Sequence, residues 1–431
     1  MTTKELVEKD HKNIWHPFTP LINPFGHIPL KSAKGCKLLT TDGNEIIDAV
    51  SSWWVNIHGH SNEKIAEAIY KQALEMEHAI FAGFTHEPAV QLSENLMTIL
   101  PVGFSKIFFS DNGSTSIEVA LKMAFQYWFN KGKKNKKKVI AIHGSYHGDT
   151  FGAMAVGERG GFSEPFFPFL FDVDFIDLPT EENKIEVYKQ FEQIAEDGNC
   201  AAFIFEPLVQ GAGGMRMYTP EMLDRLIQIA KNYDIICIAD EVMTGFGRTG
   251  TTFACDQLDN DPDIMCISKG ITGGTMALGI TASHQKIEDA FQSEEVYKAL
   301  LHGHSYTGNP LSCAASNASF EIFTSKQCKS NIQRVAARHS EFIDRLSKFD
   351  NIENIRQTGT ILAFDLKGFG ETGYDSQARK NIYPYFLDRG ILIRPLGNVI
   401  YLLPPYVITD DELNQVYEQI EKFLEQFTHQ S

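Results

Sequence analysis

Short apolar runs alternate with longer amphipathic stretches along most of this chain. The runs are rich in β-branched residues and end abruptly in polar ones, as at residues 235–239 and 264–267. Runs of this kind are typical of strands buried in a parallel sheet. The longer stretches carry apolar residues at helical spacing, as at residues 61–77. Together the two patterns predict an α/β fold.

The same patterns set the expected order of elements. Strands are expected at residues 36–41, 45–50, 106–110, 139–142, 201–205, 235–239, 264–267, 278–282, 360–366 and 391–395. Residues 111–116 should open one helix, and others are expected at residues 61–77, 88–100, 181–195, 310–323, 331–348 and 382–388. Residues 56–320 should form a large domain with a mostly parallel central sheet and helices on both faces. Residues 1–55 should join residues 321–431 in a smaller α+β domain.

Two of the predicted strands end in groups that carry chemistry. The strand at 235–239 runs into Asp240, and the strand at 264–267 runs into Lys269, which glycines follow. Open α/β sheets place their chemistry at the carboxyl ends of strands, so both side chains are expected to face one pocket. A plain ion pair is the simpler interpretation of an arbitrary Asp and Lys. However, the glycines leave room around the amine, and pyridoxal phosphate chemistry needs such a lysine together with an acid at the ring nitrogen.

The sequence around these residues resembles a known family. Residues 240–250 read DEVMTGFGRTG and residues 268–274 read SKGITGG, which is similar to the class III aminotransferases of fold type I. The resemblance covers nearly the whole chain. It implies pyridoxal 5'-phosphate as the cofactor, Lys269 as the residue that holds it and moves the proton, and Asp240 as the partner of its ring nitrogen.

Two more strand ends belong to the expected cofactor site. Gly113 and Ser114 open a helix, where backbone N–H groups bind phosphate, although such residues are more often ordinary caps. In the family this turn holds the cofactor phosphate. Tyr146, in the string SYHGDT at 145–150, matches the aromatic residue that stacks on the cofactor and contacts substrate. Asp149 is expected to orient its neighbours.

A glutamate and an arginine are expected to support this site. Glu206 follows the strand at 201–205, and Arg248 lies in the GFGRTG loop. The resemblance implies that they form a pair near the cofactor, in a pocket that admits both charged and uncharged substrates; a fixed salt bridge is the alternative. The loop also spells GxGxxG, but no clear helix follows it, so nicotinamide binding is not expected.

The stretch HGHSYTGNP at residues 302–310 is expected at a subunit boundary. In the family a hydroxyl at this point reaches the cofactor phosphate of the other subunit, and Ser305 matches it. Gly303 and His304 are expected to line the adjoining site, Gly303 on the substrate side. Many relatives have proline where His304 stands, so its contact is expected through the backbone. A site shared between two chains implies a C2 homodimer.

Three further motifs, WHPFT, SSWW and RPLGNVIYLLPPY, resemble the biotin-pathway branch of the family. They imply that Phe18 and Trp53 shape the substrate pocket and that Arg394 binds the acid tail of the substrate. An arginine at a strand end is well suited to bidentate carboxylate binding. Many members have tyrosine where this chain has Phe18, so a hydroxyl contact from that position is lost.

The activity implied is amination of 8-amino-7-oxononanoate to 7,8-diaminononanoate, a step of biotin biosynthesis, with S-adenosylmethionine as amino donor. Lysine is the alternative donor. Other class III aminotransferases, which act on ω-amino acids or diamines, are the nearest alternative activity. A mutase or decarboxylase that uses the same cofactor, and a relative that binds no cofactor, are more distant ones.

Composition and charge limit the partners. The formal net charge of -16 argues against nucleic acid and anionic membranes. No apolar run approaches membrane-spanning length, and the polar, acidic N-terminus does not resemble a signal or transit peptide. The partners expected are therefore small-molecule substrates and a second copy of the chain, in the cytoplasm.

Cysteines and histidines give no metal signature. The seven cysteines are scattered singly and odd in number, so they are expected to be core residues in a reducing compartment. His58 and His60 have metal-like spacing, but no carboxylate or cysteine cluster completes a ligand set near them. No metal site is expected.

Overall fold

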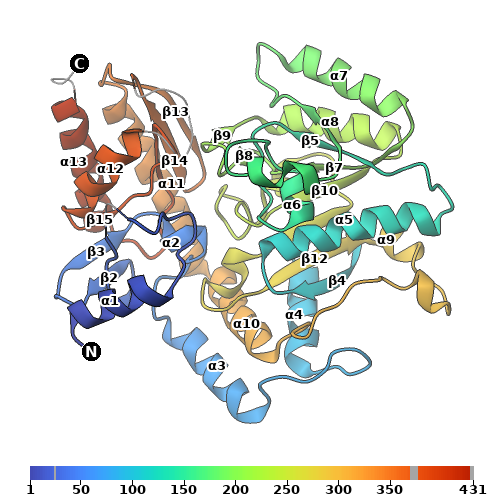
Figure 1. Cartoon of the computed structure of the whole chain (residues 1–431), viewed down its shortest axis with the longest axis horizontal. Coiled ribbons are helices and arrows are strands. Elements are labelled where there is room, and N and C mark those ends of the chain that lie inside the picture. The colour runs from blue at the N-terminus through green and yellow to red at the C-terminus, as the bar shows by residue number, and fades with distance from the viewer. Residues whose placement is uncertain (24–25, 369–376, 428–431) are drawn as a thin grey trace. The chain divides into compact units, whose positions relative to one another are not determined.

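The computed structural model of the chain describes residues 1–23, 26–368 and 377–427 (Figure 1). The chain divides into two compact units. Unit 1 comprises Met1–Asn62, Ala337–Ile355 and Leu362–Ser431, and unit 2 comprises Glu63–Ala336 and Arg356–Ile361. In the described part of the chain no helix is long and apolar enough to cross a membrane.

Unit 2 is built on a seven-stranded sheet with the order β4-β12-β11-β10-β7-β5-β6. In that order, the strands are Phe104–Ser110, Gly279–His284, Ile264–Ile267, Ile236–Asp240, Cys200–Phe205, Lys138–Ile142 and Val173–Ile176. The five strands from β11 to β6 run parallel, while β12 is antiparallel to both of its neighbours. The predicted, mostly parallel sheet is thus confirmed.

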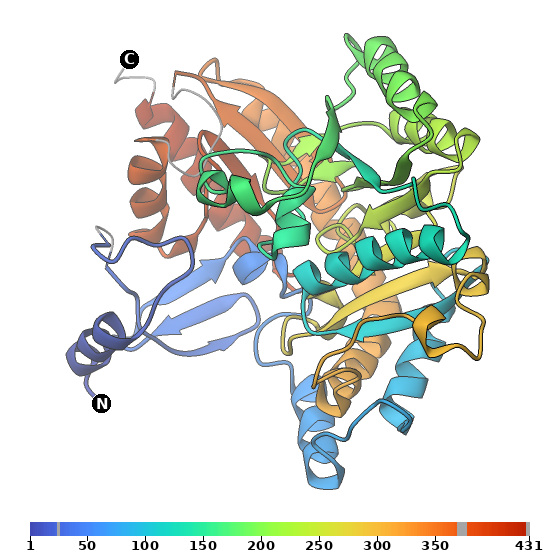
Figure 2. The same ribbon diagram turned by 45° about the vertical axis from the view of Figure 1, so that its right-hand side comes forward.

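Helices of unit 2 bury their apolar faces against this sheet. The helix α5 (Gly113–Asn130) lies along it in both views (Figures 1 and 2). Its buried face and the strands share one core of fully buried aliphatic side chains. The remaining helices are α3 (Glu63–Glu75), α4 (Glu87–Met97), α6 (Phe151–Ala155), α7 (Lys184–Glu196), α8 (Pro220–Asn232), α9 (Gln285–Asp289) and α10 (Pro310–Thr324). A small hairpin pairs β8 (Val209–Gln210) with β9 (Arg216–Met217).

Unit 1 joins segments from both ends of the chain. Its first sheet has the order β1-β2-β3-β15, with strands Leu30–Lys34, Lys37–Thr40, Glu45–Asp48 and Ile391–Leu392. Elsewhere in the unit β14 (Ile361–Leu366) pairs antiparallel with β16 (Val399–Leu402). Its helices are α1 (Thr3–Asn13), α2 (Ser51–Trp54), α12 (Gln377–Leu387) and α13 (Asp410–Phe427). Helix α11 (Lys326–Leu346) and strand β13 (Ile352–Thr358) carry the chain between the units.

One predicted strand is shorter than expected. The sequence predicts a strand over 391–395, but β15 ends at Leu392, so Arg394 lies beyond it. Pro395 has no backbone N–H with which to continue a ladder. The chain instead turns back, and Leu396 and Val399 exchange two backbone hydrogen bonds of 3.0 Å each. Arg394 therefore sits on a connection, not on a strand end.

Candidate active site

The ends of two neighbouring strands in unit 2 carry a carboxylate and an amine. Asp240 is the last residue of β10 and lies beside Cys266 in the parallel pairing of β10 with β11. Lys269 comes two residues after the end of β11 and opens the 3-10 helix η3 (Lys269–Thr272). The parallel pairing, which the apolar runs predicted, is what brings the two side chains to the same edge of the sheet.

Asp240 is buried and held from both of its oxygens. Its Oδ2 lies 2.7 Å from Nδ1 of His147, whose side chain is fully buried, and its Oδ1 accepts the backbone N–H of Val242 at 3.1 Å. Among the described residues, Nε2 of His147 has no hydrogen-bond partner. His147 lies within the SYHGDT string but was assigned no role from the sequence. Its position directly after Tyr146, a predicted cofactor residue, was the available signal.

Lys269 has an unusual backbone and an unusual amine. It is half-buried, and its φ of 46° lies in the left-handed region, which costs free energy for a residue with a side chain. Burial lowers the pKa of its amine to about 8, although the nearby carboxylates of Asp240 and Glu206 act in the opposite direction. A larger share of the amine is therefore neutral at physiological pH than for an ordinary lysine, and the neutral form is the nucleophile.

Glu206 is buried next to the same edge. Its two oxygens accept backbone N–H groups from Tyr146 and Gly211, each at 2.9 Å. Burial raises the pKa of this carboxyl to about 7, partly offset by His147. Arg248 is also buried, and its charge acts to lower the pKa of Lys269, so it lies in the same cluster. Its predicted pairing with Glu206 remains a prediction.

The predicted phosphate turn lies at the start of α5, where Gly113 is the first helical residue. A Cβ on Gly113 would lie 2.7 Å from a methyl carbon of Val242, so a larger residue does not fit. Ser114 Oγ accepts the backbone N–H of Asp149 at 3.1 Å. Gly148 has a φ of +126°, and a Cβ there would lie 1.8 Å from that same Oγ. Gly113 therefore allows Val242 to approach the start of α5, and Gly148 allows the following loop to approach Ser114.

Tyr146 is exposed, unlike the buried Asp240 and Glu206. Its hydroxyl donates to Oδ2 of Asp149 at 3.0 Å, and its backbone N–H donates to Glu206. The side chain is thereby fixed at its tip and at its base, while 39% of the residue stays exposed. An aromatic ring fixed in this way can stack on a flat heterocycle.

These residues of unit 2 fit pyridoxal phosphate. Lys269 offers an amine with a lowered pKa, Asp240 offers a buried acid, and the start of α5 offers backbone N–H groups at a glycine. The buried Nε2 of His147, unpartnered among the described residues, is a further polar atom that a bound group can satisfy.

The stretch predicted at a subunit boundary also belongs to unit 2. Gly303 and Ser305 are exposed, and His304 is half-buried. Nε2 of His304 lies 3.3 Å from the carbonyl oxygen of Phe109, and the carbonyl of Ser305 lies 2.6 Å from Nε2 of His78. The proposed contact of Ser305 with another subunit remains a prediction.

Three residues predicted to bind substrate come together in unit 1. The guanidinium carbon of Arg394 lies 4.5 Å from the ring centroid of Trp53. The ring of Phe18 lies edge-on to Trp53, with centroids 6.1 Å apart and planes at 64°. A cation over an indole face is an attractive contact. Residues far apart in the sequence thus form one group, an arginine lying against an aromatic pair.

The loop that carries Trp53 is strained and anchored by a buried acid. Within α2, Ser51, Ser52 and Trp54 all have positive φ, at 51°, 60° and 67°. Asp48 is fully buried; its Oδ2 accepts the backbone N–H of Ser52 at 2.7 Å and lies 2.8 Å from Nε2 of His60. Asp48 was not predicted as a functional residue, because the local sequence pattern does not show that this turn needs a hydrogen-bond acceptor.

Comparison with known proteins identifies the family that matches this arrangement. The family profile described as aminotransferase class-III matches residues 23–424. The adenosylmethionine-8-amino-7-oxononanoate aminotransferase of Synechococcus elongatus is 45% identical over 424 residues, which cover 96% of this chain and 99% of that protein. The protein of the same name from Geobacter sulfurreducens is 36% identical, covering 99% of this chain and 98% of that protein.

Solved structures agree with these relatives. The crystal structure of adenosylmethionine-8-amino-7-oxononanoate aminotransferase from Methanocaldococcus jannaschii matches with a TM-score of 0.90 and 35% identity, covering 97% of this chain and 99% of that one. A thermostable (S)-enantioselective omega-transaminase from Thermomicrobium roseum matches with a TM-score of 0.93 and 26% identity, covering 99% of each chain. The backbone fold therefore does not distinguish these two activities. Residues of the site must distinguish them.

Proposed function

The chain belongs to the class III aminotransferase family, and from that premise we propose that it aminates 8-amino-7-oxononanoate to 7,8-diaminononanoate, a step of biotin biosynthesis. The observation that carries the proposal is the pair formed by Asp240 and Lys269 at adjacent strand ends, with the amine pKa lowered to about 8. Two relatives that match over their full length are named for this acceptor.

The residues of unit 2 are proposed to hold pyridoxal phosphate, which when bound supplies an electron sink for the carbon that loses a proton. Gly113 and Ser114 would hold its phosphate, Tyr146 would stack on its ring, and Lys269 would carry it covalently. With its lowered pKa, the Lys269 amine would take and return the proton. Asp240, fixed by His147 at 2.7 Å, would pair with the ring nitrogen of the cofactor.

The residues of unit 1 are proposed to recognise the acceptor. Arg394 presents a planar set of donors that matches a carboxylate bidentately, and stacking on Trp53 fixes its orientation. Trp53 and Phe18 offer apolar surface that suits the methylene chain of an oxononanoate. Phe18 lacks the hydroxyl that many relatives carry, so selectivity here rests on shape.

S-adenosylmethionine is the donor we propose, because the relatives that match over the whole chain carry it in their names. Lysine is the alternative. We further propose a cytoplasmic homodimer in which Ser305 reaches the neighbouring subunit's cofactor site. All seven cysteines are buried and free, which suits a reducing compartment.

The experiment that tests this proposal is spectroscopic. The purified protein is loaded with pyridoxal phosphate and its visible absorbance is followed after addition of S-adenosylmethionine or, in a parallel sample, lysine. The acceptor is then added, and 7,8-diaminononanoate is measured by mass spectrometry. Lys269→Ala, treated identically, is the control.

Loss of the visible band with S-adenosylmethionine, followed by formation of diaminononanoate, supports donor and acceptor together. Loss with lysine alone changes the donor and keeps the acceptor. Loss of the visible band with an ω-amino acid or a diamine, without amination of the oxononanoate, assigns the chain to another branch of the family. A protein that binds no pyridoxal phosphate refutes the proposal.

A further inference from the structure

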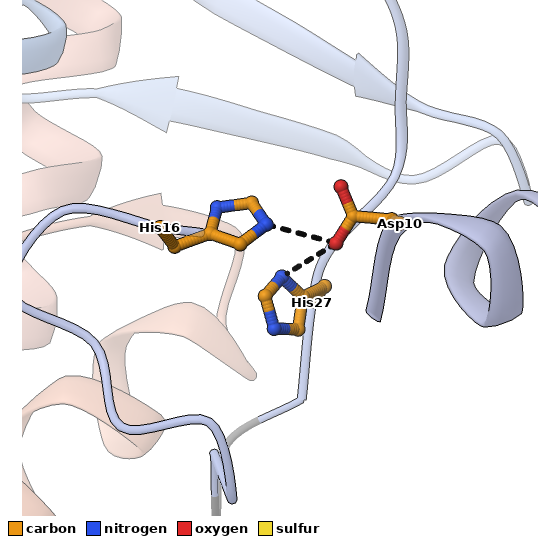
Figure 3. A group of neighbouring side chains, drawn as sticks. All are labelled: Asp10, His16 and His27. Carbon is orange, nitrogen blue, oxygen red and sulfur yellow. Dashed lines mark hydrogen bonds and ion pairs between the residues drawn. The ribbon is translucent and has the colours of Figure 1, made fainter. Parts of the chain in front are cut away.

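Three side chains at the start of unit 1 converge outside the groups described above. Asp10 lies near the end of α1, His16 follows the helix, and His27 precedes β1 (Figure 3). Nε2 of His16 lies 2.8 Å and Nδ1 of His27 lies 3.0 Å from the same oxygen, Oδ2 of Asp10. The two imidazole rings are 4.1 Å apart between centroids. In the described part of the chain this is the one group of three or more potential metal ligands so close together.

We propose that Asp10, His16 and His27 bind a divalent first-row transition cation, for which Zn²⁺ is the ion to test. Two imidazole nitrogens and a carboxylate oxygen are ligands that such ions prefer, whereas Mg²⁺ and Ca²⁺ favour oxygen alone. Neighbouring ligands that are each about 2.1 Å from one ion in a tetrahedral site stand about 3.4 Å apart. The separations of 2.8 and 3.0 Å are shorter than that by only about half an ångström, so a small outward shift of the two imidazoles would let one ion replace both hydrogen bonds to Asp10. No metal site was expected from the sequence, because neither the scattered cysteines nor His58 and His60 suggest a ligand set, and Asp10, His16 and His27 have no motif spacing.

The surroundings of these side chains give the ion a structural purpose. No residue of α1 is buried, and Ile14 and Trp15 just after it are 52% and 81% exposed. A helix this short is marginal unless something else holds it. Besides the contacts of Asp10, a bond of 2.9 Å between the hydroxyls of Thr3 and Thr41 ties the helix to the unit. A shared ion would fix α1, the turn at His16 and the segment at His27 together.

The proposed ion also bears on Phe18, two residues after His16. Phe18 has a φ of 49°, a strained value for a bulky residue, and it contacts the ring of Trp53. Holding His16 in place therefore limits the conformations open to the segment that carries Phe18. The ion takes no part in amino transfer, so binding can be tested separately from the proposed function.

The test uses the full chain with its cofactor bound, stripped of metal with a chelator and desalted. Zn²⁺ is titrated calorimetrically, and bound metal is counted by mass spectrometry. We expect one Zn²⁺ per chain, with affinity lowered at least about tenfold in Asp10→Asn, His16→Gln and His27→Gln because each removes one ligand. His11→Gln is the matched control, because His11 is the exposed neighbour of Asp10 on α1.

A second measurement needs no variant. Trypsin cleavage after Lys12 should slow several-fold when Zn²⁺ is added to the wild-type protein, because bound metal stabilises the folded segment. His27→Cys, which offers a thiolate in place of the imidazole, should retain both effects. Binding that all three ligand variants leave unchanged, or Zn²⁺ that neither binds stoichiometrically nor slows cleavage, overturns the proposal. Asp10 is then a carboxylate that simply pairs with two histidines.

Discussion

Two groups of proposed functional residues are held in place by different physical means. One is the amine and acid of unit 2, and the other is the arginine and aromatic rings of unit 1. Asp240 ends β10 and Lys269 follows the end of the neighbouring β11 by two residues, so the register of a buried parallel sheet brings both to the same edge. Trp53 and Arg394 lie on connections instead, one in the strained α2 turn and the other beyond the end of β15. Regular structure therefore positions the proposed chemistry, and loops position the proposed recognition.

The turn that carries Trp53 depends on a compensating contact, which the pair of Asp240 and Lys269 does not need. Three residues of the Ser51–Trp54 turn have positive φ, each at a cost of about 1–2 kcal/mol. Asp48 offsets part of that cost by accepting several hydrogen bonds in a fully buried position. In the Asp240–Lys269 pair of unit 2, only Lys269 has a positive φ, at 46°. Substitutions should thus affect the two regions differently.

The largest effect is expected from Lys269→Ala. This change removes the proposed covalent link and the proton carrier, so both half-reactions should fall roughly 10⁴-fold, while the unfolding free energy at pH 7 does not decrease. Lys136→Ala is the matched control: burial also lowers the pKa of Lys136, but its amine donates to the carbonyls of Tyr233 and Asp234. The control should lose stability and keep kcat. Equal losses of kcat in the two variants would contradict the assignment of Lys269.

Arg394→Ala should act on the acceptor alone. The acceptor half-reaction of the oxononanoate should lose about 100-fold in kcat/KM, because a charge-assisted pair is removed, while the methyl ester of the same acceptor should change little. Arg389→Ala is the control, since Arg389 also lies over an aromatic ring, 3.7 Å from the centroid of Tyr385. An equal loss of kcat/KM for the acid and its methyl ester in Arg394→Ala would show that the arginine does not bind the carboxylate.

Asp48→Asn tests whether the strained turn depends on its buried acceptor. We expect the unfolding free energy to fall by about 1–2 kcal/mol and KM for the acceptor to rise, with little change in the donor half-reaction. Asp42→Asn, at an exposed position of the same unit, should leave both quantities unchanged. Denaturant unfolding and stopped-flow absorbance measure them. A variant as stable as the wild type would show that the turn holds itself.

The smallest effect is a pH dependence within unit 2. Because burial raises the pKa of Glu206 to about 7, against an ordinary 4.5, the native state keeps a proton that the unfolded chain has lost. The unfolding free energy should therefore fall as pH rises from about 4.5 to about 7, by at most about 1.4 kcal/mol per pH unit from this group. Glu206→Gln should flatten that slope. Glu241, which has a similarly raised pKa, is present in both proteins, so the difference isolates Glu206. Identical slopes would contradict the raised pKa.

Local pattern was enough to predict the sheet of unit 2 except for its edge strand β6 (Val173–Ile176), which was not among the predicted strands. Runs such as 235–239 and 264–267 are apolar because both faces of a parallel strand are buried. The residue types alone therefore indicate these strands. Strand ends then follow, and with them the neighbouring positions of Asp240 and Lys269. The resemblance to class III aminotransferases added the cofactor, which no pattern of burial contains.

Only the tertiary structure decided which polar groups meet. Asp48 with Ser52 and His60, His147 with Asp240, and the cluster of Asp10, His16 and His27 all depend on how turns and termini come together. Hydrogen bonds span about 3 Å and metal–ligand bonds about 2 Å, so a small shift in a loop makes or removes them. Apolar burial tolerates such shifts, which is why the sequence determined the sheet and left these contacts to the folded chain.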